Sequence, residues 1–190
     1  MKKILFVAMM CLMNLVASAQ TEHASFKGIS MAEPPSVFVN RLTKEGFELE
    51  YEEDECTVLT GKFAGESDCM VLLYSERGLV YEVMVLFPHR SSWELVKSQY
   101  ESFKENFMLK YGAAHSELET LDLNSLRSDL MIYNALREGK QWSSRFKIPG
   151  GYADLSVYHA IGHFGNFLLS ITYQDEANDR IRKSFVMDDI

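Results

Sequence analysis

The sequence has little that could hold it in a membrane. Its one long apolar run, Ile4–Val16, is too short to span a bilayer, and no later segment approaches the roughly 18 uninterrupted apolar residues of a membrane helix. This run follows a basic start and precedes Ala-Ser-Ala at positions 17–19, an order typical of a secretory signal peptide. We therefore expect residues 1–19 to be removed and the mature chain to begin at Gln20, in the periplasm or outside the cell.

Cysteine is scarce, and none stands where a lipid anchor requires it. The anchor needs a cysteine directly after the cleavage point, but position 20 is Gln and Cys11 lies within the apolar run. We therefore expect a soluble product without a membrane anchor. Only Cys56 and Cys69 remain after the signal. A hairpin turn near Gly65 would place them of order 20 Å apart, so we expect buried thiols rather than a disulfide.

Basic residues are also few. The chain has 19 Lys and Arg against 27 Asp and Glu, and removal of the two lysines in the signal leaves a formal charge of about −10. Nucleic acids and anionic lipids require clustered cations, so neither is an expected partner. The densest charge run, residues 48–55, is acidic but lacks the spacing of a calcium loop. We expect a solvated turn there rather than a Ca²⁺ site.

The composition that is present indicates a folded chain. Apolar residues make up 47% and aromatic residues 12%, which is enough for a substantial core. Residues 20–190 are long enough for a single domain or for two small, closely packed halves.

The first half reads as a helix followed by three strands. Pro34-Pro35 suits the first turn of a short helix, with Ser30 as a possible cap and Gly46 at its end. Three strand-like runs follow, at residues 57–63, 69–74 and 79–87. Because the links between them are short, neighbouring strands must be antiparallel.

A long amphipathic helix should follow. Ser91-x-x-Glu94 has the form of a capping box, and Gly112 is placed to end the helix. Apolar residues between them recur at spacings of three and four. They are Trp93, Val96, Tyr100, Phe103, Phe107 and Tyr111.

The second half repeats this order. A helical pattern over residues 123–136 precedes three strand-like runs, and the tail after the last strand reads as a helix capped by acidic residues. The runs are residues 141–148, 152–159 and 164–173, the tail is 175–187, and the acidic residues are Asp175, Glu176 and Asp179.

The two halves, about 26–112 and 113–190, therefore resemble each other as helix–three-strand–helix units. A strand triplet with one apolar face cannot stand alone. We expect an α+β fold in which the triplets join edge to edge in one antiparallel sheet, with the helices packed on one face. The other face would stay open.

Several short motifs carry a resemblance to known proteins. They are Phe26-Lys27-Gly28-Ile29, Lys62-Phe63-Ala64-Gly65 before Cys69, Phe87-Pro88 before Trp93, Lys110-Tyr111-Gly112 and Tyr173-Gln174-Asp175. Together they resemble a family of small exported bacterial proteins of unknown function. The doubled unit is similar in fold to the beta-lactamase inhibitor protein and related envelope-assembly modules. That similarity implies protein binding rather than catalysis. Inhibition of the enzyme is not implied, because two convincing disulfides are missing.

Candidate catalytic and metal-binding residues are isolated. His159 and His163 are four residues apart, but Gly162 places them in a turn and no third ligand is evident, so we expect no metal. Ser67 and Cys69 lack the Gly-x-Ser-x-Gly elbow of a nucleophile. A thiol paired with His89 or His115 would require a proximity that the sequence does not reveal. No cofactor is expected.

Tyrosines in the strands indicate a binding surface. Tyr81 shares its parity with Val83 and should face the core, whereas Tyr158 shares its parity with polar residues and should face outward. We expect Tyr74, Tyr152 and Tyr158 to contribute to ligand binding on the open sheet face.

These observations predict a secreted or periplasmic, non-catalytic module that recognises a protein or peptide through this face. Two alternatives stay open. One is a structural or assembly factor of the cell envelope, and the other is a hydrolase that uses Cys69 or the histidines.

Overall fold

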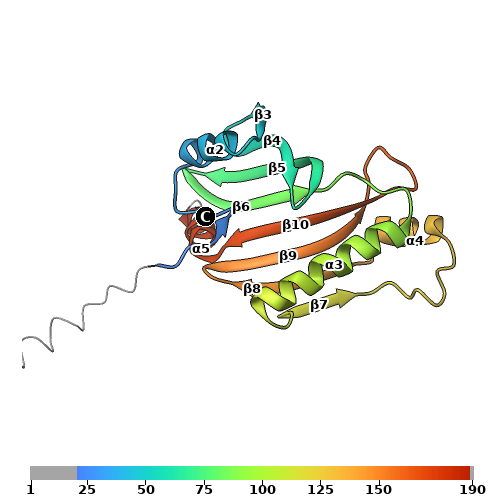
Figure 1. Cartoon of the computed structure of the whole chain (residues 1–190). Helices are drawn as coiled ribbons and strands as arrows, with labels where there is room; N and C mark the ends of the chain where they lie inside the picture. The colour runs from blue at the N-terminus through green and yellow to red at the C-terminus, as the bar shows by residue number, and fades with distance from the viewer. Residues whose placement is uncertain (1–20, 189–190) are drawn as a thin grey trace, which may run out of the picture.

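Two groups of three long strands pair edge to edge in the middle of an eight-stranded sheet (Figure 1). The first group is β4 (Cys56–Phe63), β5 (Glu66–Glu76) and β6 (Leu79–Leu86), and the second is β8 (Trp142–Ile148), β9 (Gly151–His159) and β10 (Phe167–Asp175). In the computed structural model, which describes residues 21–188, β6 pairs with β10 and all neighbours are antiparallel. The predicted α+β fold is confirmed. The predicted signal peptide lies outside the described residues.

Helices cover one face of this sheet, which we call the core face. They are α2 (Pro35–Lys44), α3 (Trp93–Tyr111) and α4 (Asp129–Arg137). In Figure 1, α3 crosses in front of β9 and β8, and α4 lies at the far end of these strands. The last helix, α5 (Glu176–Asp188), follows β10 directly and lies at the opposite end, beside β6.

A small hairpin completes the cover of the core face. It consists of β1 (Ser25–Phe26) and β2 (Ile29–Ser30), which form a sheet of their own. The ring of Phe26 lies 5.4 Å from those of both Phe63 and Tyr173, one from each half. The hairpin therefore packs against both halves at the boundary between them.

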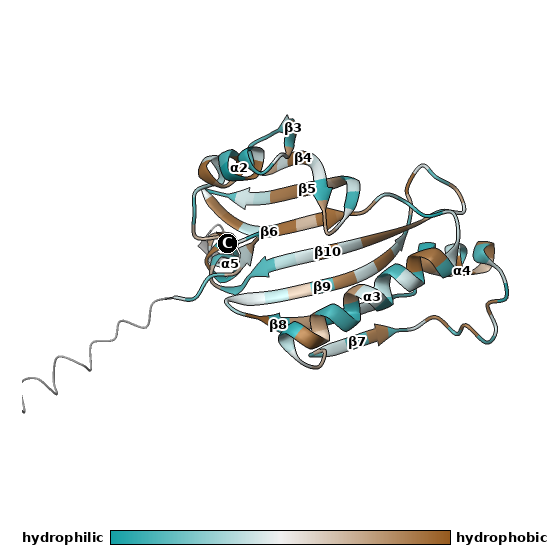
Figure 2. Cartoon of the chain, viewed as in Figure 1, coloured by the Kyte–Doolittle hydropathy of each residue, from teal (hydrophilic) through white to brown (hydrophobic). Residues whose placement is uncertain are grey.

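One cluster of buried side chains runs through both halves. Val71, Leu73 and Val83 are inaccessible to solvent on the first triplet, as is Leu155 on the second. Figure 2 shows the corresponding apolar stretches along β5, β6 and β10. Burial of this alternating apolar face is the main force that holds helices and sheet together.

Helix α3 forms where the sequence predicts it, with one change at its start. The side chain of Ser92, rather than Ser91, accepts a hydrogen bond from the backbone N–H of Leu95. Gly112 ends the helix with a φ of 88°, a conformation that glycine adopts without strain. Of the predicted contact residues, Phe103 and Tyr111 are only partly buried.

Both edges of the sheet carry strands that the sequence analysis missed. The segment Glu48–Glu52, expected to be a solvated turn, is the edge strand β3, and Ser116–Glu119 is the edge strand β7. All residues of both strands are exposed. In β3, glutamates alternate with Leu49 and Tyr51. Because an edge strand buries little, the charged residues dominate this segment and hide its strand pattern.

Three other local predictions were wrong. Helix α4 begins only at Asp129, because Asp122 forms a turn in which its carboxylate accepts the N–H of Asn124, and Ser128 then caps the helix. Strand β10 begins at Phe167, which leaves Phe164 in the preceding turn, 71% exposed. Ser30 does not cap α2, which starts without any side-chain cap.

Tyr81 is not a core residue. The ladder between β5 and β6 shifts between Tyr74 and Ser75, so that Val80 takes the buried place and Tyr81 is the extra residue of a bulge. Its half-buried ring lies 6.4 Å from that of Tyr74. Counting alternate residues predicts the wrong face for Tyr81, because the bulge shifts the alternation of the strand by one residue.

Within residues 21–188, none of the helices has the length and apolarity needed to cross a bilayer.

Candidate functional site

The sheet face opposite the helices, which we call the open face, carries cross-strand rows of side chains. The row of Tyr74 continues through Glu82, Gln174 and Tyr152 on successive strands. The next row runs through Leu72, Met84, Thr172, Asp154 and Arg145, and the one after it through Met70, Leu86, Ser170, Ser156 and Ser143. Because antiparallel neighbours are about 5 Å apart, side chains within a row can contact each other.

A hollow of about 400 Å³ lies on this face. Its lining comes from four of the long strands and from the edge strand β7. The lining residues are Glu82, Met84, Ser116, Leu118, Ser143, Arg145, Asp154, Ser156, Tyr158 and Thr172. The hollow therefore combines charged, hydroxyl, aromatic and apolar groups, the mixture that a specific ligand site requires.

One wall of the hollow is held by an ion pair. The Nε and Nη2 atoms of Arg145 donate hydrogen bonds of 2.7 Å to the two carboxylate oxygens of Asp154. This bond raises the pKa of Arg145, although burial opposes the change. A two-point bond of this kind fixes both side chains on neighbouring strands.

Glu82 lies in the hollow without such a partner. It makes no hydrogen bond or ion pair with the described residues, whereas the nearby Asp179 on α5 is held by Arg182 and Lys183. Burial raises the pKa of Glu82, and the carboxylates of Asp154 and Asp179 raise it further, whereas the charge of Arg182 partly opposes these effects. The site thus presents one carboxylate whose charge is poorly compensated.

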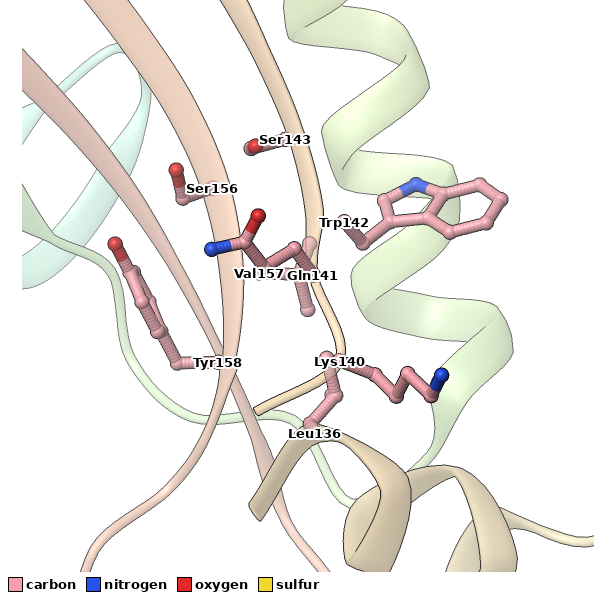
Figure 3. A pocket seen from close by; sticks show the side chains of 8 residues that line it. All are labelled: Leu136, Lys140, Gln141, Trp142, Ser143, Ser156, Val157 and Tyr158. Carbon is pink, nitrogen blue, oxygen red and sulfur yellow. The ribbon is translucent and has the colours of Figure 1, made fainter. Parts of the chain in front are cut away.

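Tyr158 stands at the end of the hollow, 46% exposed, with its side chain on the open face as its parity predicts. It also borders a smaller pocket of about 80 Å³ beside α4. Figure 3 shows the hydroxyls of Tyr158, Ser156 and Ser143 on one side of the strands, whereas the indole of Trp142 extends to the other side, toward α3. Tyr158 therefore lines both the hollow and the smaller pocket.

The other two predicted tyrosines lie on the same face but outside the hollow. Tyr74 is paired with Tyr81. Tyr152 lies beneath two cations, with Lys147 at 4.2 Å and Arg145 at 5.0 Å from its ring centre. Of the predicted ligand-binding residues, only Tyr158 therefore lines the hollow.

The thiols occupy separate places and are not bonded to each other. Cys56 is opposite Tyr74, and Cys69 is opposite Gly61, five residues farther along β4. Cys69 is inaccessible to solvent, and burial raises the pKa of its thiol, while burial followed by the charge of Glu53 raises that of Cys56. A raised pKa leaves less of the thiolate that a nucleophile requires.

The histidines form separate aromatic pairs. The ring centre of His163 lies 4.1 Å from that of His89 in a tilted arrangement, whereas His159 packs against Tyr133 and His115 against Tyr152. Within the described chain, no group of three or more His, Cys, Asp or Glu side chains is arranged to hold a metal ion. The spacing of His159 and His163 does not bring the two rings together as a pair.

Of the three acids at the start of α5, Asp175 is the cap. It is fully buried, and its carboxylate accepts the N–H groups of Asn178 and Ala24 at 2.7 Å each. Glu176 instead bonds Lys147, which lowers the pKa of its carboxyl. This capping role of Asp175 was predicted.

Sequence reasoning missed the charged and hydroxyl residues of the hollow. Asp154 and Ser156 share the parity of Tyr158, and this signal could have extended the site along β9. The contribution of Glu82 could not be foreseen, because it requires knowing that β6 pairs with β10.

Comparisons with known proteins give no further guide: no protein-family model matches the chain, and neither curated proteins nor solved structures gave a match. Both resemblances noted in the sequence stay predictions.

Proposed function

We propose that this chain is a non-catalytic binding module, exported from the cytoplasm, that holds a protein or peptide segment on its open face. The observation that carries the proposal is the hollow of about 400 Å³, which places polar and aromatic side chains on an uncovered sheet surface. Strands supply the lining, so these side chains have a rigid support. The proposal agrees with what the two resemblances imply.

The surroundings of the hollow suit an extended chain. Half-buried apolar side chains of β5 and β6, such as Leu72 and Leu86, lie in the same rows as its hydroxyl and charged groups. A peptide laid across these rows could bury its apolar side chains at one end and pair its polar groups at the other. Cys69 is buried, and the histidine rings pack against each other or against tyrosines, which does not favour the hydrolase alternative.

The test is recovery of a partner from envelope and culture-fluid extracts by immobilised protein. We expect a partner that the wild type retains and Tyr158→Ala loses. The matched control is Leu109→Ala, because Leu109 is 87% exposed on α3, away from the open face. Unfolding curves of each variant establish that it is folded. Equal recovery by wild type and Tyr158→Ala would contradict the proposal.

A further inference from the structure

The chemistry of the hollow indicates what kind of group it binds. Two carboxylates line it, and Arg145 already neutralises that of Asp154. Glu82 accepts no hydrogen bond from the described residues. Arg182 of α5 attracts its carboxylate without bonding it, because Arg182 is held by Asp179 and stacks over Tyr81 at 4.4 Å. A half-buried carboxylate without a partner is costly, and a cation brought by a ligand would remove that cost.

Aromatic rings stand beside this carboxylate. Tyr74 is the neighbour of Glu82 across β5 and β6, and the ring of Tyr81 lies 6.4 Å from that of Tyr74. Aromatic faces attract ammonium and guanidinium groups. Carboxylate and rings together therefore favour an organic cation.

A second, independent feature on the open face also lacks a partner. Ser143, Ser156 and Ser170 stand side by side across β8, β9 and β10. Ser143 and Ser156 line the hollow, and Ser170 is fully buried beside Ser156, with no hydrogen-bond partner for its hydroxyl. A buried hydroxyl without a partner is uncommon, and the accessible hydroxyls of Ser143 and Ser156 beside it can bond the polar atoms of a ligand in the hollow.

We propose that the hollow receives the lysine or arginine side chain of an extended peptide segment, with Glu82 as the partner of its cation. A peptide fits better than a free amine, because the serine row offers hydroxyls to peptide groups and the apolar rows beside it can cover neighbouring side chains. This inference rests on the proposed function and names the chemistry of its partner.

The test uses four fluorescein-labelled pools of nine-residue peptides, identical except for a fixed central Lys, Arg, norleucine or Glu. Fluorescence polarisation measures their binding to the purified protein. We expect the Lys and Arg pools to bind at least about tenfold more tightly than the norleucine pool, because they add a charge-assisted hydrogen bond. Glu82→Gln should abolish that preference. Glu105→Gln is the control, because Glu105 is exposed on α3.

Stability separates this role from a structural one. Ionised Glu82 destabilises the fold, so Glu82→Gln should raise the midpoint of thermal unfolding at pH 7 while it weakens binding. A variant that binds less and unfolds at a lower temperature would contradict the role of Glu82.

The other outcomes distinguish the two proposals. Equal binding of the Lys and norleucine pools, still dependent on Tyr158, would overturn the inference and leave the proposed function standing. If n-butylammonium binds as tightly as the Lys pool, the cation does not need to come from a peptide, and that part of the inference is overturned. Failure of every pool to bind would overturn the inference, whereas the proposed function is overturned by equal recovery from the extracts by wild type and Tyr158→Ala.

Discussion

The two halves of the sheet are alike on the core face and different on the open face. On the core face both present buried aliphatic and aromatic side chains, such as Leu73 in the first half and Leu155 in the second. On the open face the first half shows Met70, Leu72 and Met84 beside the carboxylate of Glu82 on β6, whereas the second half shows mostly charged and hydroxyl groups, among them Asp154.

The difference shows that burial controls only one side of each strand. The face beneath the helices must be apolar in both halves, because its burial stabilises the fold. Helices α2, α3 and α4 lie on the core face, so the residues of the open face can serve another purpose. The hollow reaches from Met84 and Glu82 on β6, in the first half, into the second half, whose residues form most of its lining.

The largest expected effect tests the likeness of the core faces. Leu73→Ala and Leu155→Ala should each lower the free energy of unfolding by about 2–5 kcal/mol, because each removes a fully buried side chain. Leu72→Ala, on the open face beside Leu73, is the control and should cost clearly less. Urea denaturation measures all three. If Leu72→Ala costs as much as Leu73→Ala, the two faces are not different.

The next effect concerns the contact between α3 and the second half. The hydroxyls of Tyr100 and Ser144 form a buried hydrogen bond of 2.6 Å. Ser144→Ala should destabilise the protein by about 1–3 kcal/mol, because it leaves the buried Tyr100 hydroxyl without a partner. Denaturation of the double variant Tyr100→Phe/Ser144→Ala provides the check. It should be more stable than Ser144→Ala alone, and a further loss would refute this explanation.

The same tyrosine should make the stability depend on alkaline pH. Burial raises the pKa of Tyr100 from 10.0 to about 12. Between these values the unfolded chain loses the proton before the folded one, so stability falls as pH rises, by at most about 1.4 kcal/mol per pH unit from this group. Unfolding measured from pH 9 to pH 12 should show a steeper fall for the wild type than for Tyr100→Phe. Parallel curves would contradict it.

The smallest effect sharpens the contrast between a paired and an unpaired serine. Ser170→Ala, in contrast to Ser144→Ala, should stabilise the free protein by up to about 1 kcal/mol, since it removes a buried hydroxyl that has no partner. Thermal unfolding of the two single variants gives the comparison directly. Destabilisation by Ser170→Ala would show that its hydroxyl is already bonded in the free protein.

The sequence predicts those parts of the fold that depend on local patterns. Turn glycines and alternating apolar residues located all six long strands, and the spacing from Trp93 to Phe107 located α3. The edge strands escaped because their glutamates mask the few apolar residues that alternate with them. The sequence alone could not reveal the bulge at Tyr81, because a bulge is defined by the partner strand.

The candidate site was predictable only in outline. Parity along β9 placed Tyr158 on the outer surface, but the hollow depends on strands that are distant in the sequence. Glu82 and Thr172 belong to one site only because β6 and β10 are neighbours. No local pattern carries that information.

The acidic edge strands have a consequence for how copies of this protein meet. In the described sheet, each edge strand has backbone groups on its outer side that no further strand pairs. The edge strand β3 carries Glu48, Glu50 and Glu52, and the edge strand β7 carries Glu117 and Glu119. Two molecules that approached with their β3 edges together would bring carboxylates against carboxylates, whereas Lys104 pairs with both glutamates of the β7 edge. The charge that hides β3 from pattern analysis therefore also discourages the sheet from growing at that edge.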